Sequence, residues 1–195
     1  MKDMRDDLAK CTLCADRFVA THTRHQPRPI VWFNPGAKVL IAGQAPGMRV
    51  HKSGVPFDDP SGDRLRAWLG VDRACFYDRD KFAVMPMGFC FPGYNAKGSD
   101  LPPPAICAKT WRAQALEMLE DVRVTVLIGG YAMKYHLPGF RSVTAAVRNW
   151  QAHRPGVFAL PHPSWRNTGW LKKNPWFETD VLPRLQAGVA EVING

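Results

Sequence analysis

The sequence lacks any hydrophobic run that approaches a membrane-spanning helix, which takes about 20 apolar residues. Its first ten residues, MKDMRDDLAK, are charged and have no apolar segment of the kind found in signal peptides. Internal repeats and low-complexity tracts are absent as well. These absences argue against membrane and secreted proteins. We therefore expect a cytoplasmic protein with a single domain over residues 1–195.

Acidic residues are scarce relative to basic ones. Asp and Glu number 17 against 26 Lys and Arg, which leaves a formal net charge of +9. A basic balance favours polyanionic partners, of which nucleic acid is the most common. The seven tryptophans offer flat surfaces on which bases can stack, although we expect most of them in the core or at its rim.

The five cysteines are an odd number in a chain without a signal peptide, which argues against a disulfide framework. Cys11 and Cys14 form a CxxC pair, and Cys90 and Cys107 flank a long irregular segment. Four thiolates in this order can hold zinc or an iron–sulfur cluster. A redox pair at Cys11–Cys14 and two buried structural thiols are the alternatives. Cys75 precedes an aromatic pair, and we expect it to pack in the core.

Short apolar runs alternate with helical patterns along the chain, which predicts a parallel sheet covered by helices on both faces. The fold class is thus α/β, a three-layer αβα arrangement around a four-stranded parallel sheet. The predicted strands are 39–42, 82–85, 124–128 and 157–160, and the predicted helices are 61–70, 110–119, 131–136, 142–150 and one or two over 174–192. Ser61 is the expected N-cap of the first of these helices, and Gly70 its end.

Each predicted strand is followed directly by Gly or Pro, namely Gly43, Pro86, Gly129 and Pro161, so four sharp exits share one rim of the sheet. The first exit is Gly43-Gln44-Ala45-Pro46-Gly47, and glycines there allow a ligand to approach the backbone closely. The fourth exit holds His162 between two prolines, which restrict its backbone. A fixed imidazole on the same rim as the glycine loop is a candidate catalytic or binding group.

These motifs together resemble the uracil-DNA glycosylase superfamily. The resemblance rests on GQAPG at 43–47, GVPF at 54–57, HPS at 162–164 and the order of the four cysteines, and it covers residues 11 to about 167. The iron–sulfur branch, often called family 4, is the most similar, since its first motif is GEAPG. The resemblance implies a DNA-repair enzyme, acting as a monomer on DNA with a deaminated or damaged base, that flips the nucleotide into a pocket and hydrolyses its N-glycosidic bond.

The resemblance also assigns roles to residues of the pocket. Phe57 would stack on the base, and the backbone around Gln44 and Ala45 would contact the base and the attacking water. Gly43, Pro46 and Gly47 would complete the base-binding loop. His162 would donate a hydrogen bond to the base as negative charge builds on it.

Other residues would hold the DNA and a cofactor. The segment Ser164-Trp165-Arg166-Asn167 would enter the duplex, with Trp165 as an apolar wedge. The resemblance implies a [4Fe–4S] cluster on Cys11, Cys14, Cys90 and Cys107, and zinc or no metal are the alternatives.

The sequence departs from the family pattern at three positions. Ala45 stands where some relatives have an aspartate that positions water, Gln44 replaces the glutamate of the iron–sulfur branch, and the region of Met87, expected at the base, has no uracil-reading asparagine. Asp58, Asp59 or Asp63 would restore a carboxylate, although Asp63 also suits a helix N-terminus. The substrate base therefore stays open between uracil and another deaminated base. A damaged-DNA or abasic-site binding protein and a nucleotide or nucleoside hydrolase are the alternative functions.

Overall fold

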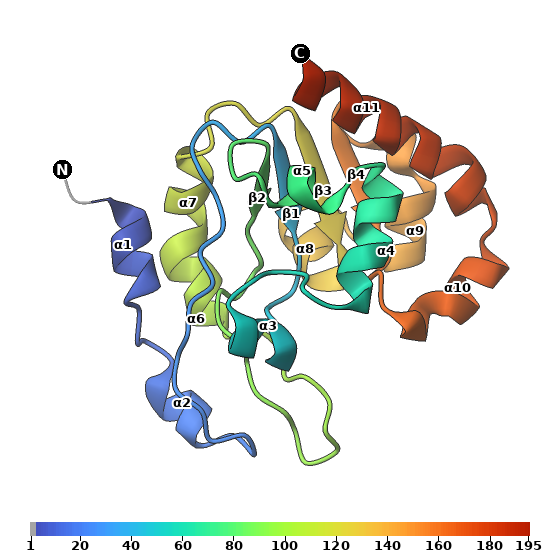
Figure 1. The fold of residues 1–195 in the computed structure, drawn as a ribbon. Helices are drawn as coiled ribbons and strands as arrows, with labels where there is room; N and C mark the ends of the chain where they lie inside the picture. The colour runs from blue at the N-terminus through green and yellow to red at the C-terminus, as the bar shows by residue number, and fades with distance from the viewer. Residues whose placement is uncertain (1–2) are drawn as a thin grey trace.

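A computed structural model describes residues 3–195 of the chain. Its centre is a four-stranded parallel sheet in the order β2-β1-β3-β4, with helices on both sides (Figure 1). The strands are β1 (Val39–Ala42), β2 (Phe82–Val84), β3 (Val124–Ile128) and β4 (Val157–Leu160). The predicted α/β fold class is therefore confirmed. The second strand ends one residue earlier than predicted, close to Pro86, which has no N–H to continue a ladder.

The helices include several one- and two-turn segments that sequence periodicity did not reveal, because five or six residues are too few to establish a repeat of 3.6. Two segments are π-helical: η1 joins α6 to α7, and η4 leads directly into α11. The bounds are α1 Met4–Ala9, α2 Ala15–Val19, α3 Met48–Ser53, α4 Pro60–Leu69, α5 Arg73–Tyr77, α6 Ala105–Cys107, η1 Ala108–Arg112, α7 Ala113–Glu117, α8 Gly129–His136, α9 Val143–Arg148, η2 Trp150–Ala152, η3 Trp165–Asn167, α10 Thr168–Lys173, η4 Phe177–Val181 and α11 Leu182–Asn194.

The sheet separates two apolar cores in its β1–β2 half. Val39 and Ile41 of β1 belong to a large cluster with residues of α4, α5 and α11, whereas Leu40 belongs to a second cluster with residues of α1 and α7. Successive strand residues point to opposite faces, so each face of this half buries one cluster. Both faces are therefore covered, and the ends of the strands remain as the place for a ligand.

Helix α4 begins one residue earlier than predicted, and its cap is different. Asp59, not Ser61, is the N-cap, and its Oδ1 accepts the Gly62 N–H at 2.9 Å. Asp59 takes this place because Pro60 fits the first helical turn, where no N–H is needed. Gly70 ends the helix in the left-handed conformation with φ 70°, as the sequence predicts. In residues 3–195, every helix is too short or too polar to cross a bilayer.

Candidate active site

A pocket of about 730 Å³ opens at the carboxyl end of the sheet. The end of every strand contributes to its wall, through the loop 43–47 after β1, Pro86 after β2, Ile128 of β3 and the loop 162–166 after β4. The chain reverses its direction across the sheet between β1 and β3. Open α/β sheets bind ligands at such a switch point, so the topology places a ligand site here.

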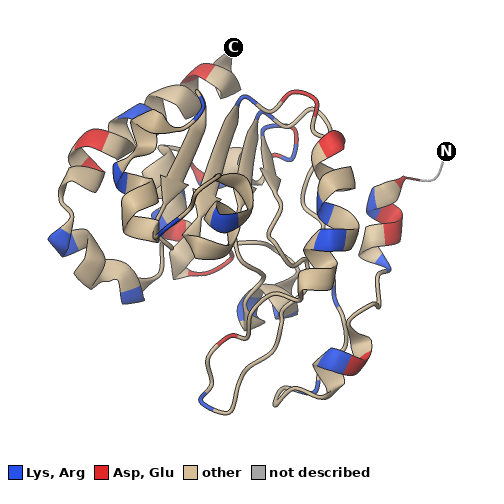
Figure 2. Ribbon diagram, turned by 180° about the vertical axis from the view of Figure 1, so that it is seen from behind, with Lys and Arg blue, Asp and Glu red and all other residues tan. Residues whose placement is uncertain are grey.

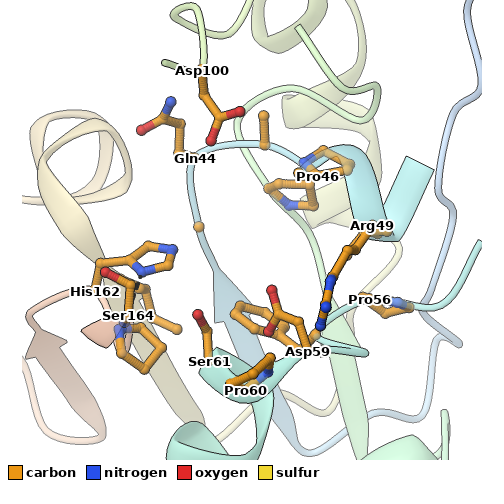
Figure 3. A pocket seen from close by; sticks show the side chains of 18 of the residues that line it. Gln44, Pro46, Arg49, Pro56, Asp59, Pro60, Ser61, Asp100, His162 and Ser164 are labelled. Atoms are coloured by element: carbon orange, nitrogen blue, oxygen red, sulfur yellow. Dashed lines mark hydrogen bonds between the residues drawn. The ribbon is translucent and has the colours of Figure 1, made fainter. Parts of the chain in front are cut away.

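The pocket brings together most of the residues that the sequence suggests for the site. The remaining lining comes mainly from residues 49–50 of α3, from the segment 56–64 at the start of α4 and from residues 99–100 of the long loop after β2 (Figure 3). The predicted residues found in the lining are Gly43, Gln44, Ala45, Pro46, Gly47, Phe57, His162, Ser164, Trp165 and Arg166.

Met87 does not line the pocket, contrary to expectation. Its side chain is buried, and its backbone N–H donates to the carbonyl of Gly43 at 2.9 Å. The next N–H, of Gly88, donates to the carbonyl of Gln44 at 3.0 Å. Pro86 faces the pocket instead, because neighbouring residues of an extended segment point to opposite sides. Met87 thus supports the first loop through its backbone.

Phe57 has an unusual backbone. Its φ of 54° lies in the left-handed region, which is rare for a bulky residue and marks a functional constraint in many sites. The Phe57 carbonyl accepts the hydroxyl of Tyr77 at 3.1 Å, and its ring meets the ring of Phe76 edge to face at 6.1 Å. On the other side Gly62 approaches so closely that any Cβ there would lie 1.8 Å from the Phe57 oxygen. The aromatic ring is therefore held rigidly in the pocket wall.

Arg66 is the second support of Phe57. It is buried, with 5% of its surface exposed, and its guanidinium donates to the Phe57 carbonyl at 3.4 Å. The same group forms an ion pair with Asp63 at 2.6 Å and lies 5.6 Å from the ring centroid of Tyr77. Asp63 therefore serves the helix and its arginine, and it does not line the pocket.

His162 has a defined orientation at the mouth of the pocket. Its Nδ1 accepts the backbone N–H of Ser164 at 3.2 Å, so the ring hydrogen of the neutral form lies on Nε2. Asn167, predicted to contact DNA, lies outside the lining and donates its amide to the carbonyl of His162 at 2.8 Å. His162 is exposed at the mouth of the pocket, but the protein around its ring lowers the pKa of His162 by desolvation, against the opposing attraction of Asp59. At neutral pH the imidazole is a neutral hydrogen-bond donor.

Two of the described residues that line the pocket carry a carboxylate, Asp59 and Asp100. Figure 3 shows Asp59 beside Ser61 at the start of α4, and Asp100 next to Gln44 on another wall. Of the three aspartates considered from the sequence, only Asp59 is in the lining. The sequence offered no signal for Asp100, because it lies in an irregular loop. Burial raises the pKa of Asp100, and Arg166 opposes that rise.

The rim of the pocket is basic and carries one exposed aromatic. Arg49, Arg64 and Arg166 belong to the lining, and Arg64 also donates to the carbonyl of Ser164 at 3.1 Å, which ties α4 to the loop after β4. The side chain of Trp165 is 75% exposed. Lys and Arg are otherwise spread over several helices and loops on the side that Figure 2 shows. The rim therefore combines an exposed apolar ring with nearby cations.

The four cysteines suggested as ligands line a second cavity, which is small and apolar. All of them are free thiols. The backbone N–H of Phe89 donates to the sulfur of Cys107 at 3.4 Å, and the indole of Trp111 donates to that of Cys11 at 3.3 Å. Burial raises the pKa of Cys90 to about 12 and that of Cys107 to about 11, so both are neutral thiols in the absence of a cation.

The sulfurs do not converge on one point. In the part of the chain that the structure describes, no three His, Cys, Asp or Glu side chains form a group that holds a single metal ion. The structure nevertheless joins Cys11 and Cys14 of the N-terminal segment to Cys90 and Cys107, which lie some eighty residues later in the chain. The chain order in the sequence predicted this grouping, but not its geometry.

The family comparison agrees with the pocket. The family model described as the uracil DNA glycosylase superfamily matches residues 30–186, a range that includes the first loop, Phe57, both pocket carboxylates and His162. The match covers most of the chain and does not distinguish the iron–sulfur branch from the others. On this match and the α/β fold around the pocket, the chain belongs to the uracil DNA glycosylase superfamily.

Proposed function

We propose that the protein is a DNA glycosylase that hydrolyses the N-glycosidic bond of a flipped-out uracil or other deaminated base. One observation carries the proposal: the neutral imidazole of His162 has its donor Nε2–H in a pocket whose wall also holds Phe57 and the carboxylate of Asp59. Membership of the superfamily supports a glycosylase-type enzyme with DNA as its substrate.

The leaving base takes the bonding electrons as the C1′–N bond breaks and becomes an anion. A fixed donor at the base oxygen stabilises that charge as an oxyanion hole does, and loss of one such donor costs about 3–4 kcal/mol in comparable enzymes. His162 suits this role because its imidazole is neutral: it donates a hydrogen bond to the base and acquires no charge of its own that another group would have to balance. The Ser164 N–H on Nδ1 and the Asn167 amide on the His162 carbonyl hold the ring and its loop in place.

The attacking water needs an acceptor for its proton. Asp59 is the carboxylate of the 57–63 segment that lines the pocket, and its charge acts on His162, so the two groups share the reaction centre. In the proposed step the water oxygen bonds to C1′ while its proton moves to the Asp59 carboxylate. Asp59 would thereby supply the carboxylate that is missing at position 44, where Gln44 replaces the glutamate of the iron–sulfur branch. General base catalysis of this kind typically contributes 10²–10⁴-fold to the rate.

The rim supplies the contacts to DNA in this proposal. Trp165 would fill the space that the flipped nucleotide leaves, and the arginines at 49, 64 and 166 would bind the flanking phosphates. The amide of Gln44 is held only by a long contact of 3.5 Å to the carbonyl of Leu101, so it is available to the base. An amide offers a donor and an acceptor to the N–H and C=O edge that uracil and hypoxanthine share, which keeps both bases as candidates.

We also propose that the four cysteines hold a [4Fe–4S] cluster, with zinc as the alternative. Free thiols from two distant segments around one cavity, two of them with N–H donors on sulfur, fit such a group. A single zinc ion requires four ligands that converge at about 2.3 Å, whereas a [4Fe–4S] cluster is larger and is also held by four cysteine thiolates. When bound, the cluster would cross-link the N-terminal segment to the segment that carries Asp100.

Excision assays test the proposed activity. Single- and double-stranded oligonucleotides with one uracil or one hypoxanthine are incubated with the native protein, with His162→Ala and with His22→Ala, an exposed control histidine outside the pocket. We expect an abasic product from the native protein and the control, and at least a hundredfold slower release from His162→Ala. Absence of product together with salt-dependent DNA binding would instead indicate a protein that binds damaged DNA without cleaving it.

A further inference from the structure

The protein buries two arginines, and they differ in how their charge is balanced. Arg66 is 5% exposed and pairs with Asp63 at 2.6 Å, so the two charges cancel. Arg112 is completely buried, and no carboxylate among residues 3–195 forms an ion pair with it. An unpaired buried cation is costly, so its presence calls for a functional reason.

Arg112 is held by neutral acceptors. One nitrogen donates to the carbonyls of Met85 at 2.9 Å and Pro86 at 3.2 Å, and another lies 2.5 Å from Nε2 of His136. The guanidinium also lies 5.1 Å from the ring centroid of Tyr135. Its Nε–H has no acceptor within the described chain. Arg112 is the last residue of the π-helical turn η1, and such turns are frequent at functional sites.

The charge of this group is a full positive one at neutral pH. Burial lowers the pKa of Arg112 to about 10, which still leaves it protonated. Burial and the neighbouring guanidinium lower the pKa of His136 to about 4, so His136 is a neutral acceptor. Among the described residues, Arg154 is the only other charged group that acts appreciably on His136, and it is also a cation. Tyr135 and Cys107 are the groups whose charges act on Arg112, and neither is a carboxylate. The cluster of Arg112, His136 and Tyr135 therefore has a net positive charge.

This charge lies directly behind the wall of the candidate active site. Pro86 lines the pocket, and its carbonyl oxygen is one of the acceptors of Arg112. The carbonyls of Met85 and Pro86 thus orient their negative ends toward the guanidinium. The thickness of one residue separates the cation from any group that contacts Pro86 in the pocket.

We propose that Arg112 stabilises the departing base anion through its electric field from behind Pro86, and that the absence of a carboxylate partner preserves this field. The inference rests on the proposed glycosylase activity and adds a residue that never touches the base. Electrostatics supports this role, because the pocket contains two carboxylates, Asp59 and Asp100, which oppose the negative charge that develops on the base. A preorganised charge of this kind needs no reorganisation as the reaction proceeds.

The size of the effect follows from Coulomb's law. Unit charges roughly 8 Å apart at an effective dielectric constant of about 20 interact strongly enough to change a rate about 30-fold. The effect applies only to the charge that develops on the base. The contribution of Arg112 to the rate is therefore smaller for a base that is a better leaving group, because such a base needs less external stabilisation of its negative charge in the transition state.

His136 offers a test that leaves Arg112 in place. His136→Glu puts a carboxylate where the neutral imidazole is and neutralises the guanidinium, whereas His136→Gln supplies a neutral acceptor of the same length. The two variants differ by one charge. Glu would also form an ion pair with the buried guanidinium of Arg112, so we expect this variant to fold, and thermal unfolding measures its stability. Arg112→Lys and Arg112→Gln form a second pair, in which Lys keeps the charge and Gln keeps a donor for the carbonyls.

The readout is single-turnover release of uracil and of 5-fluorouracil from the same oligonucleotide. Fluorine stabilises the base anion, so 5-fluorouracil leaves with less need of external charge. We expect His136→Glu to release uracil about 30-fold more slowly than His136→Gln, with a clearly smaller difference for 5-fluorouracil. Arg112→Lys should likewise release uracil faster than Arg112→Gln, and the difference in rate should be smaller for 5-fluorouracil.

The outcomes separate this inference from the function on which it rests. A native protein that releases neither base removes the proposed activity, and the inference with it. If the native protein is active and His136→Glu and His136→Gln release uracil at equal rates, only the inference is overturned. An equal loss on both bases would also overturn it, because that result indicates a structural role for the cluster.

Discussion

The contact between Gly62 and Phe57 allows a sharp test of how the pocket is held. An alanine at position 62 would place its Cβ 1.8 Å from the Phe57 carbonyl oxygen and 2.7 Å from the carbonyl carbon. The carbonyl cannot simply move away, because Tyr77 and Arg66 both donate to it. Phe57 already has a φ of 54°, so its backbone has little freedom to adjust. Gly62→Ala should therefore displace Phe57.

The expected magnitude combines two opposing effects. Overpacking of a well-packed site typically costs 1–3 kcal/mol, and a contact this short belongs at about 3. Alanine is favoured over glycine in a helix by about 1 kcal/mol, which leaves a net loss of about 2 kcal/mol. For a chain of this size that corresponds to a fall in Tm of about 4–8 °C. A shift of Phe57 by about 1 Å is expected to slow excision about a hundredfold.

Gly188→Ala is the matched control. Gly188 also lies within a helix, α11, but the nearest atom to its added Cβ is a ring carbon of Phe158 at 3.8 Å, an ordinary contact. This variant should gain up to about 1 kcal/mol from helix propensity and keep native activity. Thermal unfolding and single-turnover excision measure both properties. If Gly62→Ala matched Gly188→Ala in Tm and rate, the argument that Gly62 holds Phe57 in place would be wrong.

Three further predictions address pH, DNA and the cysteines. The pKa of His136 is about 4 in the folded protein against 6.5 for the free side chain, so the unfolded state binds more protons between these values, and stability should fall by up to about 3 kcal/mol as pH drops from 6.5 to 4; urea unfolding should show a shallower fall for His136→Gln. Trp165→Ala should weaken binding to abasic DNA without a change in Tm, because Trp165 is 75% exposed, whereas Tyr131→Ala, which also removes an exposed aromatic but lies outside the pocket, should bind normally; equal affinities would exclude the wedge. Cys14→Ser should lower the iron content of the purified protein, and Cys75→Ser, outside the second cavity, should not; iron-free native protein would contradict the proposed cluster.

Features that depend on residues close together in the sequence could be predicted, and features that depend on contacts between distant segments could not. The strands 39–42, 124–128 and 157–160 follow from short apolar runs, and the rim of the sheet follows from the glycines and prolines after them. Phe57 and His162 were recognised because each belongs to a short local motif. These features depend on neighbouring residues, so the sequence by itself determined them.

Only the tertiary structure decided the rest. Three features depend on contacts between segments far apart in the chain. They are the place of Asp100 in the pocket wall, the fact that Pro86 and not Met87 lines the pocket, and the unpaired charge of Arg112. Such contacts leave no periodic or local pattern in the sequence. Many different residues of suitable size could occupy either position without changing the pattern of the neighbouring residues. The sequence therefore determined the sheet and the motifs at its rim, whereas long-range packing determined which charges reach the pocket.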